Sequence, residues 1–110
     1  GFSRAYSIVY HLRPPTRVRR VEPAGSLTVD DAPQDVLRHH HLKSGQLPAV
    51  GDPVTGRTPL FTNPDVTLWR CRPAEAQKEL YRNAAADEVL FVHRGAGVLH
   101  SLFGPLPVKP

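Results

Sequence analysis

Residues 81–104 read YRNAAADEVLFVHRGAGVLHSLFG, and this stretch decides the fold that the sequence predicts. Two apolar runs, residues 88–93 and 98–103, flank a short link that contains Gly95 and Gly97. Apolar runs of this length on either side of a glycine-containing link are typical of two strands in a β-hairpin. Gly95 at the first central position of the link suits a two-residue type II′ turn. We therefore expect a hairpin here.

The remaining sequence also predicts strands rather than helices. Its 12 prolines and 8 glycines interrupt the chain at short intervals and leave little room for a long helix. Alternating or β-branched apolar residues predict further extended segments at residues 6–13, 16–22, 36–43, 58–62, 66–72 and 80–83. Residues 73–79 are the piece most compatible with a helix, of about two turns. The sequence thus predicts an all-β chain with short connecting loops and minimal helix.

Length and composition set further bounds. A chain of 110 residues forms one domain at most. No apolar run approaches the ~20 residues that a membrane-spanning helix needs, so we expect no membrane partner. Cys71 is the single cysteine and cannot form an internal disulfide, which fits a reducing cytoplasm. Because it lies in a predicted strand, we expect Cys71 to be a small buried hydrophobe rather than a nucleophile.

The formal net charge is +4, and four arginines gather near the start of the chain: Arg13, Arg17, Arg19 and Arg20. A nucleic-acid-binding chain would show a basic face interleaved with aromatic residues, or a known binding module. The sequence shows neither, so we expect no nucleic-acid partner. Solvated arginines on an edge strand or at a subunit contact are the ordinary explanation.

The seven-residue spacing from Glu88 to Gly95 resembles the second half of the first cupin motif. That motif consists of a glycine, an H-x-H pair, a glutamate and a closing glycine. The resemblance implies a cupin-like jelly-roll barrel, of which this chain is an incomplete N-terminal portion. Residues i and i+2 of a strand point to one face, so H-x-H aims two imidazoles into the barrel. With the glutamate and a later histidine they hold Fe(II).

In this chain Tyr81 and Asn83 occupy the two H-x-H positions. Of the degenerate motif positions Tyr81, Asn83, Glu88 and Gly95, only Glu88 offers a good ligand for Fe(II). We therefore expect no metal ligand, no cofactor-binding residue and no catalytic residue at this motif. Glu88 is then a carboxylate that needs a hydrogen-bond partner.

Two groups of histidines lie elsewhere in the sequence. In the expected hairpin His93 and His100 share a face diagonally, but Glu88 points to the opposite face and cannot join them. In the run of residues 39–41, a strand would turn His40 away from its two neighbours. Surface or packed histidines are the default expectation for both groups.

The chain as a whole resembles the N-terminal region of the homogentisate 1,2-dioxygenases, in particular the shorter bacterial branch of that family. The most specific match is LYRN at residues 80–83, followed by DEVLFVH at residues 87–93. Weaker matches cover nearly the whole chain: Gly1-Phe2-Ser3, Tyr10-His11, Pro14-Pro15-Thr16, Leu42-Lys43, Asp52-x-Val54-Thr55-Gly56-Arg57, Asn63-x-Asp65-Val66 and Phe103-Gly104.

This resemblance implies a two-cupin enzyme of tyrosine and phenylalanine catabolism. Such an enzyme uses Fe(II) and O2 to open the aromatic ring of homogentisate, giving maleylacetoacetate. The family binds iron through two histidines and a glutamate of its C-terminal cupin, and no position here matches that ligand motif. Residues 1–110 are then the N-terminal part of a metal-free cupin domain, truncated before the second cupin motif. The implied partners are the remainder of the polypeptide, further copies in a homo-oligomer and an aromatic substrate.

Two alternatives remain open at this point. A stand-alone, metal-free cupin would bind or sense a small ligand. A different cupin enzyme, such as an isomerase or epimerase, would need no metal and could use His93 or Tyr81 as an acid or base.

Overall fold

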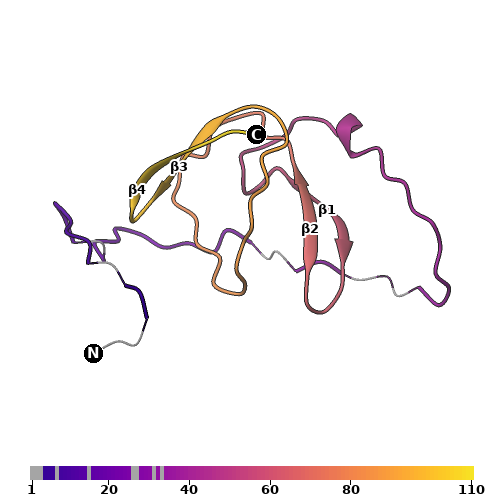
Figure 1. Cartoon of the computed structure of the whole chain (residues 1–110), viewed down its shortest axis with the longest axis horizontal. Helices are drawn as coiled ribbons and strands as arrows, with labels where there is room; N and C mark the ends of the chain where they lie inside the picture. The colour runs from indigo at the N-terminus through magenta and orange to yellow at the C-terminus, as the bar shows by residue number, and fades with distance from the viewer. Residues whose placement is uncertain (1–3, 7, 15, 26–27, 31, 33) are drawn as a thin grey trace. The chain divides into compact units, whose positions relative to one another are not determined.

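A computed structural model describes residues 4–6, 8–14, 16–25, 28–30, 32 and 34–110 of the chain. They fall into two compact units, one of Gly25–Ala85 and one of Gly1–Ala24 with Ala86–Pro110. The described residues form antiparallel pairs of β1 with β2 and of β3 with β4 (Figure 1). Their elements are η1 (Ser44–Gln46, a 3-10 helix), β1 (Arg57–Thr62), β2 (Thr67–Cys71), β3 (Gly97–Ser101) and β4 (Gly104–Val108). The all-β prediction is confirmed; the cupin barrel stays a prediction.

The β1–β2 hairpin lies in the Gly25–Ala85 unit, where the sequence predicted strands at residues 58–62 and 66–72. β-branched and aromatic residues favour these strands: Thr58, Phe61 and Thr62 in β1, and Thr67 and Trp69 in β2. Their register shifts between Pro59 and Phe61, which indicates a β-bulge. Proline has no backbone N–H to give to a ladder, so a local irregularity in β1 beside Pro59 is in keeping with its chemistry.

The turn of this hairpin is built by Asn63. Its Oδ1 accepts hydrogen bonds from the backbone N–H of Asp65 at 2.9 Å and of Val66 at 2.7 Å. A backbone bond of 3.0 Å from the N–H of Asn63 to the carbonyl of Val66 closes the same turn. Just behind it, the hydroxyls of Thr62 and Thr67 lie 2.8 Å apart across the two strands. Asparagine followed by proline is a turn signal, so the sequence specifies this hairpin locally.

The second hairpin differs from the prediction. Residues 88–93 are not a strand, and β3 pairs with β4 instead, through a turn at Leu102-Phe103. The Ser101 hydroxyl supports that turn, because it accepts a bond from the N–H of Phe103 at 3.1 Å and donates one to the Gly104 carbonyl at 3.2 Å. Gly104 completes it with φ +104°, a conformation that favours glycine.

The chain also turns at Gly95, where φ is +89°. This agrees with the expected use of a glycine in the link, but residues 88–93 do not run back along β3. The predicted face shared by His93 and His100 depended on that pairing and is therefore wrong.

Several other predicted segments are not strands in the described part of the chain: residues 6, 8–13, 16–22, 36–43 and 80–83. Residues 73–79 contain no helix. A half-buried strand is stabilised mainly by apolar surface packed against it, and these segments have little. Tyr10, Leu37 and Leu80, for example, are 92%, 99% and 93% exposed.

Some sequence expectations fall outside the described residues. They are the match at Gly1-Phe2-Ser3, Ser7 within the first predicted strand, and Pro15 of the Pro-Pro turn. In the part that is described, no helix has the length and apolar character required to cross a bilayer.

Among the described residues, no hydrophobic side chain is buried. Burial of apolar surface is the dominant favourable contribution to folding, and the described residues make little use of it.

Candidate functional site

Tyr81, at the first H-x-H position, contacts a cation. The Arg57 guanidinium carbon lies 5.2 Å from the centroid of the Tyr81 ring, which is the geometry of a cation–π interaction. The Nε of Arg57 also donates a hydrogen bond of 2.9 Å to the carbonyl of Pro53. Arg57 thus links a loop, the start of β1 and Tyr81 within the Gly25–Ala85 unit. The Tyr81 side chain serves packing here.

Asn83, at the second H-x-H position, is engaged with the backbone that follows it. Its Oδ1 accepts a hydrogen bond of 3.0 Å from the N–H of Ala85, the bond of an Asx turn. This arrangement gives Asn83 a role in turning the chain after residues 80–83.

Glu88 and Gly95 belong to the unit of Gly1–Ala24 with Ala86–Pro110. The residue Glu88 is exposed rather than buried. Gly95 is also exposed, and its positive φ suits the closing glycine of a turn. The metal-free cupin motif at the four degenerate positions therefore stays a prediction. The feature of the structure that corresponds to it most directly is the turn at Gly95.

The most elaborate hydrogen bonding described in the chain surrounds Asp52. Its Oδ1 accepts bonds from the backbone N–H of Val54 at 2.7 Å and of Thr55 at 2.9 Å. In return, the Asp52 N–H donates to the Thr55 hydroxyl at 3.1 Å, and the Asp52 carbonyl accepts from the Gly56 N–H at 2.8 Å. The backbone bonds from Thr55 and then Val54 hold the pKa of Asp52 below its ordinary value of 3.8.

Two glycines allow this loop to close tightly. A Cβ on Gly56 would lie 2.1 Å from the Val50 carbonyl oxygen, and the residue is buried. Gly51 has φ +53°, and a Cβ there would meet the Thr55 Oγ1 at 2.6 Å. Only glycine fits at either position without displacing its neighbours.

Arg72 attaches this loop to the segment before it. Its guanidinium donates to the carbonyls of Gly45, at 3.0 Å, and Leu47. The Arg72 carbonyl accepts the N–H of Val50 at 3.0 Å. Residues 45–56 are thus bonded to the end of β2 and form one ordered corner of the Gly25–Ala85 unit.

Cys71, at the end of β2, is partly exposed rather than fully buried. Its Sγ lies 3.7 Å from the Pro53 carbonyl oxygen. Burial raises the pKa of the thiol above its ordinary value of 9.0, although the charge of Arg57 acts in the opposite direction. A raised pKa disfavours the thiolate, so the expectation of a packing cysteine rather than a nucleophile is supported, while complete burial is wrong.

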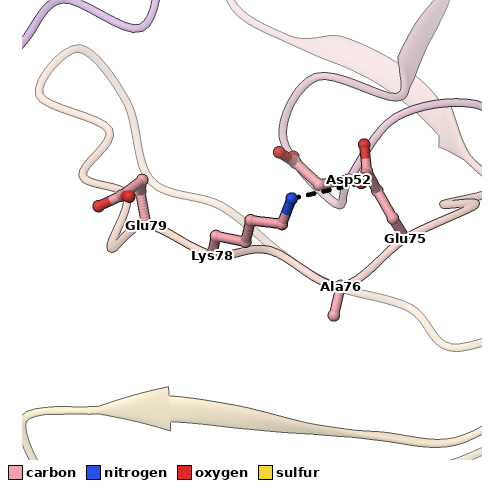
Figure 2. Close-up of a pocket in the computed structure, with 5 residues that line it drawn as sticks. All are labelled: Asp52, Glu75, Ala76, Lys78 and Glu79. Carbon is pink, nitrogen blue, oxygen red and sulfur yellow. Dashed lines mark ion pairs between the residues drawn. The ribbon is translucent and has the colours of Figure 1, made fainter.

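A shallow polar depression lies beside this loop and is lined by Asp52, Glu75, Ala76, Lys78 and Glu79 (Figure 2). The Lys78 side chain extends toward Glu75, with Nζ 4.0 Å from Oε2, while Glu79 points away. Both partners of this ion pair are largely exposed, and such pairs contribute little. Ligand pockets are usually concave and mostly apolar, which this surface is not.

One histidine of the run at residues 39–41 makes a packing contact. His40 lies edge-on to Phe61, with ring centroids 6.5 Å apart and planes at 77°. Its Nε2 is 3.0 Å from the Oε1 of Gln34. Across the described residues, no three histidine, cysteine or acidic side chains gather as metal ligands would.

Sequence reasoning did not single out the Arg57–Tyr81 contact, because 24 positions separate the two residues and no local signal joins them. The Asp52-x-Val54-Thr55-Gly56-Arg57 pattern is part of the family resemblance, and the prolines and glycines of residues 44–59 also predict a turn-rich connection there. Aspartate followed by proline and, shortly after, glycine is a turn signal that points to this loop directly.

Comparison with known proteins gives similarity along almost the entire chain. The chain is 34% identical over 110 residues to a Saccharolobus solfataricus protein named "Putative dioxygenase". The match covers 99% of this chain and 29% of that relative, so the chain spans less than a third of the relative's length. No protein-family model matches the chain. No solved structure matches it either.

Proposed function

We propose that these 110 residues are a structural segment of a dioxygenase that cleaves the aromatic ring of homogentisate. The similarity to a protein named as a dioxygenase carries the proposal, because it extends over 99% of the chain. The finer assignment to homogentisate rests on the LYRN and DEVLFVH sequences, which resemble the N-terminal region of that family.

The proposal places the iron chemistry outside this segment. Fe(II) in ring-cleaving enzymes is held by imidazole and carboxylate ligands that leave positions open for O2 and substrate. The donors at positions 81 and 83 do not suit it: Tyr81 packs against Arg57, and Asn83 accepts a backbone N–H. We therefore assign no step of ring cleavage to the residues described.

The hydrogen bonds made by the polar side chains support a structural role. Asp52, Asn63, Asn83 and Ser101 each bond to nearby backbone and shape a turn. Many large apolar side chains of the described residues, by contrast, remain exposed and available for packing against further polypeptide. A segment with ordered turns and an uncovered apolar surface is suited to completing a larger fold.

The direct test is O2 consumption by the complete gene product that contains these residues. Purified protein reconstituted with Fe(II) should consume O2 when homogentisate is added and should form maleylacetoacetate, detected by its absorbance. Glu88→Gln in the same protein should leave bound iron unchanged and lower stability more than turnover. Absence of O2 uptake with homogentisate, in protein shown to be folded and iron-loaded, would refute the substrate assignment.

A negative result with homogentisate leads to a defined second measurement. The same preparation is offered other dihydroxyphenyl acids with O2 electrodes as the readout. Uptake with one of these keeps the dioxygenase class and changes the substrate. Loss of iron on Glu88→Gln, with folding intact, would contradict the placement of the metal site elsewhere.

A further inference from the structure

The two edges of the β3–β4 hairpin differ in chemistry. β4 contains prolines at two alternate positions, Pro105 and Pro107, which pair with His100 and Val98 of β3. Alternate pairs of an antiparallel ladder exchange both N–H···O bonds, and the pairs between them direct their backbone groups outward. Because proline has no N–H, Pro105 and Pro107 belong to the outward-directed pairs.

The hydrogen bonds between β3 and β4 are then made by the intervening pairs: Gly97 with Val108, Leu99 with Leu106, and Ser101 with Gly104. It follows that the outer edge of β4 has no N–H donor at residues 105 and 107. Proline on an edge strand is a known means of preventing another strand from pairing there. The outer edge of β4 is therefore closed to a full ladder.

The outer edge of β3 has the opposite character. Val98 and His100 direct their N–H and C=O groups away from β4, and both residues can donate and accept. No partner for these backbone groups occurs among the described residues. Both side-chain faces of β3 are exposed along its length as well. β3 thus presents outward-directed N–H and C=O groups along this edge, together with exposed apolar side chains.

The comparison with the relative indicates what occupies this edge. The matched region is 29% of that relative's length, so a protein of that length has more than twice as much polypeptide outside the region as within it. Val98 and Leu99 of β3 and Leu106 of β4 are 54%, 42% and 56% exposed, and such polypeptide could pack against them.

We infer that a strand from polypeptide outside these 110 residues adds to the outer edge of β3, and that β4 remains the edge of the sheet. The inference rests on the proposed function, in which the chain is part of a longer dioxygenase. It is consistent with the relative, most of whose length lies outside the matched region. The added strand bonds to Val98 and His100, and its apolar residues continue the face formed by Leu99 and Leu106.

Amide hydrogen exchange tests the inference at single residues of the complete gene product. The Val98 and His100 amides, which point away from β4, should exchange on the order of 100-fold or more slowly than their intrinsic rates, with the ladder amides of Leu99 and Leu106 as the internal reference. The readout requires no substrate, iron or turnover. Protection of these amides in a protein without dioxygenase activity would leave this inference standing and overturn the proposed function alone.

Substitutions sharpen the test. Val98→Pro removes an outward N–H but none of the β3–β4 ladder bonds, so it should lower protection at His100 at least roughly tenfold. Val98→Thr keeps the N–H and should behave like the unchanged protein. Should Val98→Pro abolish folding, the amide exchange of the unchanged protein still decides the question.

Three outcomes would overturn the inference. Val98 and His100 amides that exchange near their intrinsic rates while the Leu99 and Leu106 amides are protected would show that no strand is added. A complete gene product without any polypeptide besides these 110 residues would leave the proposed added strand with no source. Protection that depends on protein concentration, together with a doubled mass in light scattering, would assign the edge to a second copy.

Discussion

The Arg57 guanidinium carbon lies 5.2 Å from the centroid of the Tyr81 ring, so the start of β1 is tied to a residue 24 positions further along the chain. The same guanidinium donates to the Pro53 carbonyl, which orients it. This contact gives the residue at the first H-x-H position a partner that a metal ligand would not have. It also offers a direct measure of how much Tyr81 contributes to stability.

A double-mutant cycle measures that contribution. Arg57→Gln and Tyr81→Leu, alone and combined in the complete gene product, should give a coupling free energy of about 0.5–1 kcal/mol, because both side chains are partly exposed. Tyr81→Phe keeps the ring and should retain most of the coupling. The free energies come from urea unfolding. A coupling of zero would mean that the two groups do not interact in solution.

Asp52 should make the stability of its loop depend on pH. The folded pKa is below the unfolded value, so the carboxylate stabilises the folded loop fully above about pH 4 and loses that effect as pH falls through the folded pKa. Amide protection at Val54 and Thr55, corrected for intrinsic exchange, should therefore be constant from pH 5 to 7 and fall in strong acid. Asp52→Asn should remove most of this pH dependence. Protection that rises on acidification would contradict the assignment.

Gly56→Ala should destabilise the loop because its Cβ would lie 2.1 Å from the Val50 carbonyl oxygen. We expect a loss of about 1–3 kcal/mol in the free energy of unfolding of the complete gene product. Gly45→Ala is the matched control, since its Cβ meets no described atom within 4 Å and its φ is not positive. Equal effects of the two substitutions would argue against the close approach seen at Gly56.

Gly104→Ala should weaken the β3–β4 turn, because alanine is strained at φ +104° although space is open there. The expected cost is about 1–3 kcal/mol, read as lost protection of the Leu99 and Leu106 amides. Gly97→Ala serves as the control in the same hairpin, since its Cβ would make an ordinary contact of 3.9 Å with Val108 Cγ2. Unchanged protection in Gly104→Ala would mean that the turn adopts another conformation.

Cys71 should react slowly with thiol reagents near neutral pH, because burial raises its pKa above 9.0. The rate of modification by a disulfide reagent should keep rising beyond pH 9, whereas an unperturbed thiol levels off near its ordinary value. Unfolding in urea should increase the rate at pH 7.5. A folded-state rate that levels off below pH 8 would indicate an activated thiolate instead.

Much of the local structure was predictable because neighbouring residues specify it. The β-branched and aromatic residues of 58–62 and 66–72 predicted β1 and β2, and the Asn63-Pro64 pair between them is itself a turn signal. The prediction of a helix at residues 73–79 is wrong, because no packed surface is present there to stabilise two helical turns. At the candidate motif, sequence reasoning placed a glycine turn at Gly95, where φ is indeed positive.

The choice of strand partners could not be read from apolar runs alone. Residues 88–93 and 98–103 suggested one hairpin, yet Ser101 and Gly104 provide a better-bonded turn on the other side of β3. Both β4 prolines are compatible with that pairing because outward positions need no N–H. Prolines at the alternate positions 105 and 107 are themselves typical of an edge strand after Gly104.

Local sequence was enough to indicate the all-β character and the glycine turn at Gly95, because proline, glycine and Asx residues restrict the backbone within a few positions of themselves. The pairing of β3 with β4 and the contact of Tyr81 with Arg57 emerged only from the fold. Those outcomes depend on competition between hydrogen-bonded and packed arrangements of residues distant in sequence, and local preferences do not rank them.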